Sequence, residues 1–216
     1  MIKNDREYRN FSSFDLIETR AEEGEEKSLI VEGYASTFEP YTLFESNSEK
    51  WVEIIERHAF DETDMTDVVF LRDHAGTVLA RTKNNLVGLS IDDGGLFTKT
   101  DLSRTSAARQ MYEDIKAKNY TQMSFAFVTD RDSETWSEER IEDKTIITRS
   151  IGRIKKVYDI SAVAFPANPT TEIGLSARSL FDGEIERLKA ERLEKEREIR
   201  RRAAMALKLK LIENNL

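Results

Sequence analysis

The chain lacks cysteine altogether and contains only two histidines, His58 and His74, among its 216 residues. Without thiols it can form no disulfide, no cysteine nucleophile and no cysteine-based zinc site, and the redox compartment cannot be inferred. The two histidines share no metal-ligand spacing, so neither a zinc site nor another cofactor is expected. Chemistry near neutral pH must therefore come from hydroxyls, carboxylates and two imidazoles.

Long apolar runs and an excess of positive charge are also missing. No uninterrupted apolar stretch approaches the roughly 18 residues of a membrane span. The first residues, MIKNDREYRNF, lack the apolar core of a signal peptide. Asp and Glu number 41 against 33 Lys and Arg, which argues against a nucleic-acid-binding surface. We expect a soluble, intracellular protein with neither a membrane nor a nucleic acid as partner.

A change in composition near residue 180 divides the chain. Beyond Gly183 the residues are almost all strong helix formers, and Glu alternates with Arg or Lys at spacings that permit ion pairs four residues apart. The apolar residues of this tail keep no clean heptad, so it is interpreted as a single solvated helix, with a loosely coiled partner helix or a removable interaction segment as alternatives. We divide the chain into a charged segment (1–27), a central domain (28–180) and a helical tail (181–216).

The central domain contains segments with the two-residue alternation of β-strands. In chain order these segments are 28–38, 67–74, 85–92, 95–102, 122–130, 145–159 and 160–168. Asp93-Gly94 separates two of them and is a hairpin signal, and the EEGEEKS stretch before the first strand resembles a turn or linker. The pattern predicts a mostly β domain of the α+β class, built as a barrel or a curled sheet.

One helix is predicted inside this β domain, over residues 103–119. Ser103 is its candidate N-cap, and Ala107, Met111 and Ile115 lie on one helical face. A second, short helix is expected to start at AFDET, next to His58.

Two side chains stand out as candidates for chemistry. Ser124 lies in the apolar strand TQMSFAFVTD, where packed neighbours would fix its hydroxyl, although no G-x-S-x-G elbow surrounds it. His74 lies in LRDHAG, at the polar end of an apolar strand, where a rigid scaffold can hold an imidazole in a cleft. From the residues alone, the favoured interpretation of Ser124 is a core or edge serine, and that of His74 is a strand-end residue bonded to a loop carbonyl. Other serines, including Ser90, Ser106 and Ser161, compete on equal terms.

Five motifs between residues 28 and 180 resemble, in the expected order, the prohead proteases of tailed bacteriophages, the serine peptidases that mature a viral capsid. The motifs are VEGYASTFE, EIIERHAFDET, VVFLRDHAGTVLARTKNNLVGLSIDDGGLFTKTDL, MSFAF and VYDISAVAFPANPTTEIGLSARSL. Each motif alone is weakly specific, but the ordered set is specific.

This resemblance implies a fold similar to the herpesvirus assemblin proteases, a closed or nearly closed β-barrel with flanking helices. It also implies a Ser-His catalytic pair. His74, from RDHAG, matches the family's general base, and Ser124, from MSFAF, matches its nucleophile. His58 occupies a place where the family often has glycine, so a surface or capping role is expected for it. Arg72-Asp73 departs from the asparagine or apolar residue common before the histidine in relatives.

A third catalytic residue would orient the imidazole through its distal nitrogen, and a carboxylate is favoured because no third histidine exists. Asp159 is the preferred candidate, since relatives commonly carry an acid there and it enters an apolar run. Asp73 and Asp101 are alternatives. For the oxyanion, backbone amides or an arginine, either Arg149 or Arg153, are expected.

The resemblance further implies the protein's partners and place of action. The substrates would be the major capsid protein, scaffold segments and the protease itself, cleaved inside the procapsid as it assembles in the host cytoplasm. The helical tail would hold the enzyme in the procapsid or be removed by self-cleavage, and self-association, for example as a dimer, is implied. Two other interpretations remain: a non-catalytic capsid assembly module of the same fold, and a small-ligand β-barrel in which Ser124 and His74 are far apart.

Overall fold

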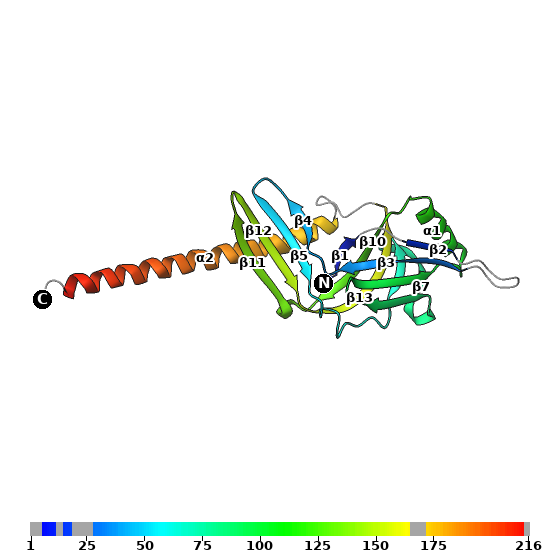
Figure 1. Ribbon diagram of the computed structural model, residues 1–216, viewed down its shortest axis with the longest axis horizontal. Coiled ribbons are helices and arrows are strands. Elements are labelled where there is room, and N and C mark those ends of the chain that lie inside the picture. The colour runs from blue at the N-terminus through cyan, green and yellow to red at the C-terminus, as the bar shows by residue number, and fades with distance from the viewer. Residues whose placement is uncertain (1–5, 12–14, 19–27, 165–171, 214–216) are drawn as a thin grey trace. The chain divides into compact units, whose positions relative to one another are not determined.

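The computed structural model describes residues 6–11, 15–18, 28–164 and 172–213 (Figure 1). The chain divides into two compact units, Met1–Ala177 and Arg178–Leu216, and each is treated by itself. The strands are β1 (Glu7–Phe11), β2 (Asp15–Glu18), β3 (Leu29–Thr37), β4 (Tyr41–Glu45), β5 (Glu49–Ile55), β6 (Val69–Arg72), β7 (Ala75–Arg81), β8 (Val87–Ile91), β9 (Gly95–Asp101), β10 (Gln122–Thr129), β11 (Glu134–Ile141), β12 (Lys144–Ile151) and β13 (Ile154–Val163). The helices are α1 (Ser106–Lys116) and α2 (Glu172–Glu213), with short 3-10 turns η1 (Thr82–Asn84) and η2 (Arg131–Ser133).

The strands of the described residues form three separate sheets. Their strand orders are β1-β10-β13-β6-β7, β11-β12-β5-β4 and β2-β3-β9-β8. Most neighbours are antiparallel, but β13 runs parallel to β6 and β12 runs parallel to β5. The mostly β fold with a long C-terminal helix is therefore as expected.

The predicted closed or nearly closed β-barrel is wrong. None of the three sheets closes on itself within the described strands. A closed ring would require the edge strand β1, which pairs with β10, to pair on its other side with a strand of another sheet, but β1 is the last strand of its sheet. β3 contacts β1 and β10, yet it pairs with β2 and β9 instead.

Local sequence explains the best-defined strands. Along β3, buried and half-buried side chains alternate, as the two-residue period predicts. The β8–β9 hairpin predicted at Asp93-Gly94 is confirmed, with Val87 opposite Thr100 and Ile91 opposite Leu96. Gly95 is required at the end of this turn, because its φ is +146° and a Cβ would lie 2.1 Å from the Ser36 carbonyl oxygen.

A single hydrophobic core runs through the first unit. Buried aromatic and aliphatic side chains come from α1 and from strands β3, β5, β6, β7, β8, β9, β10, β12 and β13. Phe125 and Phe127 of β10 stack with ring centroids 4.4 Å apart, and Phe60 lies 6.5 Å from Phe125. The strand that carries Ser124 is therefore fixed to the centre of the core.

The internal helix α1 is confirmed, with two corrections. Its N-cap is Thr105, whose hydroxyl accepts the Ala108 amide at 3.1 Å, whereas the Ser103 amide donates to Asp101. The buried face consists of Ala108, Met111, Tyr112 and Ile115, and Ala107 is exposed. Because the cap lies two residues later than predicted, the helix begins later as well.

The prediction of a short helix starting at AFDET is also wrong. Residues 57–62 form turns, in which the Ala59 amide bonds to Glu56 and the Asp61 amide bonds to His58, each over three residues. Ala59 and Phe60 are buried, so this segment joins the core as a turn rather than as a helix.

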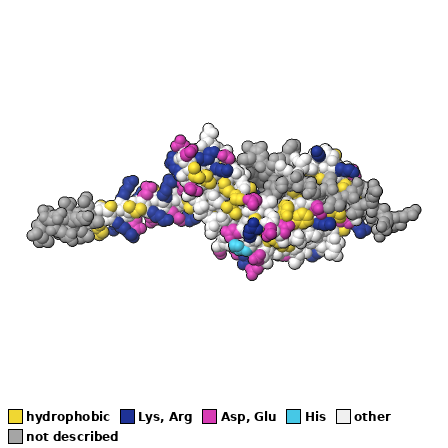
Figure 2. Space-filling view, in the orientation of Figure 1, with side chains coloured by type: hydrophobic (Ala, Val, Ile, Leu, Met, Phe, Trp, Pro, Cys, Tyr) yellow, Lys and Arg dark blue, Asp and Glu magenta, His cyan; other side chains and the backbone are white. Residues whose placement is uncertain are grey.

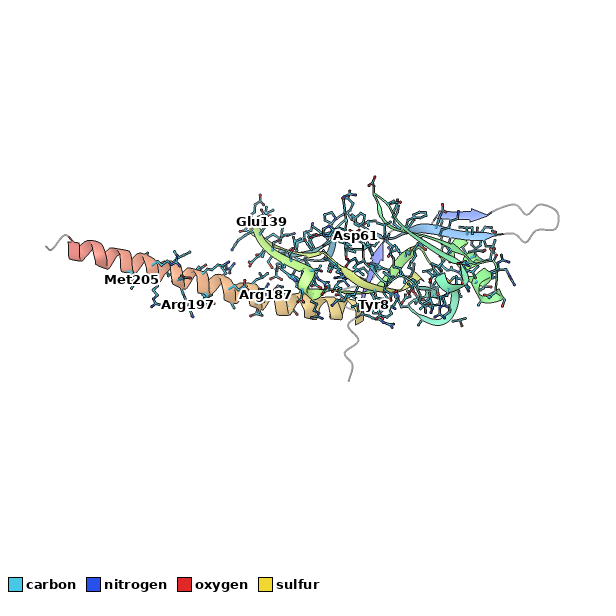
Figure 3. The ribbon with its side chains drawn as sticks, turned by 90° about the horizontal axis from the view of Figure 1, so that it is seen from below. Tyr8, Asp61, Glu139, Arg187, Arg197 and Met205 are labelled. Carbon is cyan, nitrogen blue, oxygen red and sulfur yellow. The ribbon has the colours of Figure 1, made fainter. Side chains whose placement is uncertain are left out.

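The second unit is formed by the rest of the helix α2. Ion pairs between residues four apart are present as expected, Arg187 with Glu191 and Glu198 with Arg202. Basic and acidic side chains alternate along the helix in Figure 2, and Figure 3 shows Arg187, Arg197 and Met205 projecting outward from it. No helix in the described ranges is both long and apolar enough to cross a membrane. The EEGEEK part of the predicted linker lies outside the described residues.

Candidate active site

Strand β10 explains why a serine lies among packing residues. Met123, Phe125 and Phe127 point into the core, so the alternating residues Ser124 and Ala126 point to the opposite face. Across the sheet, Ser124 pairs in register with Ser161 and Ala126 with Asp159, both on β13. The alternation of two neighbouring strands thus brings a hydroxyl and a carboxylate to the same face.

His74 completes this face from the adjacent β6–β7 turn. Its Nε2 lies 2.6 Å from Ser124 Oγ, and its Nδ1 lies 2.5 Å from Asp159 Oδ1. The structure therefore brings together three side chains singled out in the sequence, in a chain of hydrogen bonds from hydroxyl through imidazole to carboxylate. All three are largely buried: Ser124 is 0% exposed, and the side chains of His74 and Asp159 are 9% and 6% exposed.

A tight turn sets the position of the imidazole. β6 and β7 pair at Arg72 and Ala75, which leaves Asp73 and His74 as a two-residue turn with φ values of 47° and 57°. Positive φ at both central residues is what a type I′ hairpin requires, and it is uncommon for residues other than glycine and asparagine. The Asp73 amide bonds to the Ala162 carbonyl at 3.0 Å, which ties the turn to β13. Strained backbone of this kind clusters at functional sites.

Ser161 supports the arrangement and was not distinguished from other serines in the sequence. Its hydroxyl donates to Asp159 Oδ1 at 2.8 Å, accepts the His74 amide at 3.2 Å and lies 3.2 Å from His74 Nδ1. The signal that would have found it is its spacing, because a residue two positions from Asp159 on a strand shares its face. Ser90 and Ser106 are exposed and lie on β8 and at the start of α1.

The N-terminal strand β1 covers part of this face. Tyr8 packs edge-on against His74, with ring centroids 4.6 Å apart (Tyr8 is labelled in Figure 3). The Arg9 carbonyl oxygen lies 2.9 Å from Ser124 Oγ and accepts a hydrogen bond from it. Nothing in the sequence indicated this contact, because the segment 1–27 was predicted only to be charged.

The two predicted oxyanion arginines are not brought to Ser124. Arg149 is fully buried and bonds to carboxylates through Nε, Nη1 and Nη2. Arg153 is half exposed and pairs with Glu62 at 2.8 Å and Asp130 at 3.8 Å. Neither guanidinium contacts Ser124 or His74 among the described interactions.

Arg149 belongs instead to a group of buried charges that we call the ion cluster. Its members are Glu7, Arg9, Glu53, Glu134 and Arg149. Burial opposes the ionisation of Glu7, but Arg9 and Arg149 outweigh it and lower the pKa of Glu7 to about 2. The same arginines hold the pKa of Glu53 below its ordinary value despite complete burial. Burial disfavours the charged form of Arg149, yet Glu53 and Glu7 raise its pKa well above the ordinary range.

The other sequence candidates lie elsewhere. Asp73 accepts the Ala164 amide at 3.3 Å, and Asp101 accepts the Ser103 amide at 2.8 Å, so neither takes the place of Asp159 beside the imidazole. His58 is an exposed side chain that contacts Glu56 at 3.1 Å. Within the described ranges, no group of His, Asp and Glu side chains is arranged to hold a metal ion.

A small hollow of about 190 Å³ adjoins the turn that carries His74. Arg72, Ala75, Thr77 and Leu79 line it from β6 and β7, and Ala107, Gln110, Met111 and Asp114 line it from α1. This volume is below the roughly 300 Å³ or more of pockets that bind drug-sized ligands.

Comparison with known protein families identifies the group to which this chain belongs. A sequence model of the caudovirus prohead serine proteases matches residues 15–184. The chain belongs to the caudovirus prohead serine protease family. The resemblance found in the sequence motifs is thereby confirmed, and the chain is a protease of the class that acts in capsid maturation. Such a role is consistent with a place in the assembling procapsid.

This prohead protease was also compared with solved structures and with curated proteins. The bacteriophage T4 capsid assembly protease, gp21, is similar in structure over 76% of this chain and 100% of that chain, with 10% sequence identity and a TM-score of 0.41. No curated protein matches the chain. The family match begins after β1, so the strand that covers Ser124 precedes the matched residues.

Proposed function

We propose that this prohead protease is a serine endopeptidase in which Ser124 is the nucleophile, His74 the general base and Asp159 the residue that orients the imidazole. The observation that supports this assignment is the hydrogen-bond chain, with 2.6 Å between Ser124 Oγ and His74 Nε2 and 2.5 Å between His74 Nδ1 and Asp159 Oδ1. A nucleophile, its base and an orienting acceptor within hydrogen-bond reach are the defining features of a catalytic triad.

Each group has a defined part in acyl transfer. With Nδ1–H donated to Asp159, Nε2 of His74 is free to take the Ser124 proton as Oγ attacks the scissile carbonyl carbon. The imidazolium then gives its proton to the leaving amine as the C–N bond breaks. Water, deprotonated by the same nitrogen, attacks the acyl-enzyme and releases Ser124 with its proton restored.

Ser161 and the oxyanion donors complete the proposed machinery. By donating to Asp159 and accepting the His74 amide, Ser161 is a positioning residue for both. Since Arg149 and Arg153 are engaged with carboxylates, we assign the oxyanion to backbone amides.

The substrates that fit the family are the major capsid protein, scaffold segments and the protease itself, cut inside the procapsid in the host cytoplasm. The tail α2 has exposed side chains such as Leu193 and Ile199, so it offers an accessible segment for self-cleavage or for retention in the procapsid. Self-association, for example as a dimer, is proposed on the resemblance alone.

The test is co-expression of the chain with its cognate major capsid protein, followed by intact-mass analysis over time. Ser124→Ala abolishes capsid cleavage and self-trimming while leaving the thermal unfolding transition nearly unchanged. The matched control is Ser90→Ala, which removes the same hydroxyl from an exposed position of β8 and leaves cleavage intact.

The competing function is a non-catalytic capsid assembly module of the same fold. It predicts the same set of fragments from wild type and Ser124→Ala after long incubation, and that result would refute the endopeptidase proposal. The small-ligand alternative required Ser124 and His74 to lie far apart, and the 2.6 Å between them disfavours it.

A further inference from the structure

The hollow of about 190 Å³ beside the β6–β7 turn is close to the triad but contains none of its residues. Two residues that line it, Arg72 and Ala75, lie on either side of His74 in the sequence. Consecutive Cα atoms are about 3.8 Å apart, so the wall of the hollow begins within about 4 Å of the His74 backbone. Because His74 Nε2 lies 2.6 Å from Ser124 Oγ and an extended chain advances about 3.3 Å per residue, substrate residues a few positions from the scissile bond can reach the hollow.

The hollow lies between β7 and one face of α1. Its helical residues are three, four and seven positions apart, which is the spacing of a single helical face. These residues are Ala107, Gln110, Met111 and Asp114. Leu79 and Met111 are buried, whereas Thr77 and Gln110 are exposed. The hollow therefore has an apolar floor and a polar rim, which suits a side chain with an aliphatic stem and a polar end.

The volume of the hollow limits what it can bind. A cavity of about 150 Å³ is large enough to hold benzene, whereas pockets for whole drug-sized molecules begin at roughly 300 Å³. A glutamate side chain has fewer non-hydrogen atoms than benzene, so a hollow of about 190 Å³ has room for it. The occupant that fits is one side chain of a longer molecule.

Two of the lining residues are charged, Arg72 and Asp114, and they differ in their partners. Asp114 Oδ1 accepts hydrogen bonds from the side-chain amides of Gln110 and Asn119, each at 3.3 Å. The guanidinium of Arg72 is exposed and makes no hydrogen bond or ion pair with any residue that the structure describes. A planar guanidinium binds a carboxylate through two parallel N–H bonds. The unmatched group at the hollow is therefore a donor that suits a carboxylate.

Strand β7 also offers backbone groups to a polypeptide beside the hollow. β7 is the last strand of its sheet, and no described strand pairs with its outer edge. Residues 75–78 of this strand are exposed. An open strand edge binds an extended peptide by adding it as a further strand. Main-chain bonds to β7 and a side chain in the hollow can thus hold the same polypeptide.

We propose that the hollow between β7 and α1 is a specificity subsite of the protease, which takes an acidic side chain of the substrate a few residues from the scissile bond and binds its carboxylate through Arg72. The inference rests on the proposed function of Ser124, and it adds the class of substrate that this site prefers. Its occupant is identified by the unmatched guanidinium and by the position of the hollow next to His74.

The first test is cleavage of a library of natural peptides by the full chain, with mass spectrometry to locate each cut. We expect cuts to be most frequent where one fixed position near the bond is Glu or Asp. The best-cut peptide is then synthesised with Glu, Gln or Lys at that position, and kcat/KM should be about tenfold higher for Glu than for Gln, the factor of one charge-assisted bond. No acidic preference at any position overturns the proposal, and a preference for Lys or Arg overturns it in favour of a site built on Asp114.

Substitution of Arg72 tests the assignment of the carboxylate-binding group. In Arg72→Gln the tenfold preference for Glu over Gln should disappear, and in Arg72→Glu it should reverse in favour of Lys. A disturbance of the turn alone lowers kcat/KM for all three peptides together and leaves their ratio at tenfold, a result that overturns the proposal. The matched control is Arg57→Gln, which removes an exposed arginine bonded to the Asp93 carbonyl and should keep the preference.

A second variant approaches the hollow from the helix and leaves the turn untouched. Ala107→Glu adds a carboxylate to the wall formed by α1, and its repulsion should lower the preference for Glu several-fold. Thermal unfolding establishes that each variant is folded. If Arg72→Gln does not fold, an unchanged preference in Ala107→Glu overturns the proposal by itself.

Binding to the Ser124→Ala chain tests the hollow without cleavage. The probes are acetyl-Ala-Glu-Ala-amide and its Gln and Lys counterparts, followed by NMR through the amide signals of Thr77 and Gln110. The Glu peptide is expected to bind about tenfold more tightly than the Gln peptide, and equal dissociation constants would overturn the proposal. If wild type cuts no peptide while the Glu peptide binds at the hollow, the endopeptidase assignment fails and the acid-binding hollow stands.

Discussion

The two buried polar networks beside β1 and β10 both contain a buried carboxylate, Glu53 in one and Asp159 in the other, but they have opposite properties. The ion cluster sets two arginines against three glutamates, and its charges are held by several charge-assisted bonds each. The triad holds Ser124, His74 and Asp159 with one bond between each neighbouring pair. The cluster has no proton to pass between its ionised members at neutral pH, whereas the triad is arranged to pass one.

This difference indicates which substitutions affect stability and which affect chemistry. Breaking the ion cluster leaves an unpaired charge in the core, so its effect should appear in unfolding experiments. Changing the triad alters the position of a proton without emptying the core, so its effect should appear in turnover. Single substitutions in each network therefore distinguish the two: those in the ion cluster change the free energy of unfolding, and those in the triad change turnover.

After the complete loss of cleavage expected for Ser124→Ala, the largest effect is expected for Asp159→Asn. Asparagine keeps the shape but cannot accept the Nδ1–H in the same way, so the imidazole adopts the wrong tautomer and kcat for peptide cleavage should fall about a thousand- to ten-thousand-fold. Single-turnover cleavage of the capsid substrate measures this. Full activity in Asp159→Asn would show that the contact with His74 has no catalytic role.

The next largest effect is a loss of stability in Glu53→Gln. Glu53 is 0% exposed and bonds to both Arg9 and Arg149, so its loss should cost about 3–5 kcal/mol of unfolding free energy. Denaturant titration measures the change. Glu45→Gln is the comparison, since Glu45 pairs with Lys144 on the surface and should have little effect. Equal losses for the two variants would contradict the special role of the ion cluster.

Acid should weaken the ion cluster in a defined pH range. The pKa of Glu7 is lowered from 4.5 to about 2, so its contribution is complete above about pH 4.5 and is lost as the pH falls towards 2. A shift of this size corresponds to stability on the order of 3 kcal/mol. Unfolding free energies measured from pH 5 to pH 2 should fall more steeply in wild type than in Glu7→Gln. Parallel curves would exclude Glu7 as the titrating group.

The smallest effect is expected for Ser161→Ala. Loss of its bonds to Asp159 and to the His74 amide should lower kcat by about tenfold, because the imidazole is held less firmly. KM should stay unchanged, since Ser161 positions other groups rather than binding substrate. A change confined to KM would argue against this positioning role.

Much of the β-strand structure of the first unit could be predicted from local sequence. β3, the β8–β9 hairpin and β10 are marked by regular alternation and by a turn dipeptide, and the structure has all three. The family resemblance, rather than local pattern alone, singled out Ser124, His74 and Asp159. The fold places these three within hydrogen-bond distance, and their catalytic roles stay a prediction.

Other elements could not be predicted, because their partners are distant in sequence. Glu7 and Arg9 look like surface residues in EYRNF, yet Arg9 is buried against Glu53, which is 44 positions away. β11 is mostly exposed and charged, so it carries no apolar alternation, and its pairing with β12 gives it a strand conformation. The barrel prediction failed for the same reason, because β1 pairs with β10, a strand more than 100 residues away in sequence, and local sequence does not specify that pairing.

The turn at Asp73 and His74 also limits how this protease can vary. The imidazole is placed by the length of a two-residue connection and by the positive φ of both residues, rather than by a loop that packing could adjust. One inserted residue would change the turn type and the register of β7 against β6, and would carry Nε2 away from Ser124. Insertions that diversify substrate preference are therefore confined to other connections, and the β6–β7 turn acts as a spacer of fixed length.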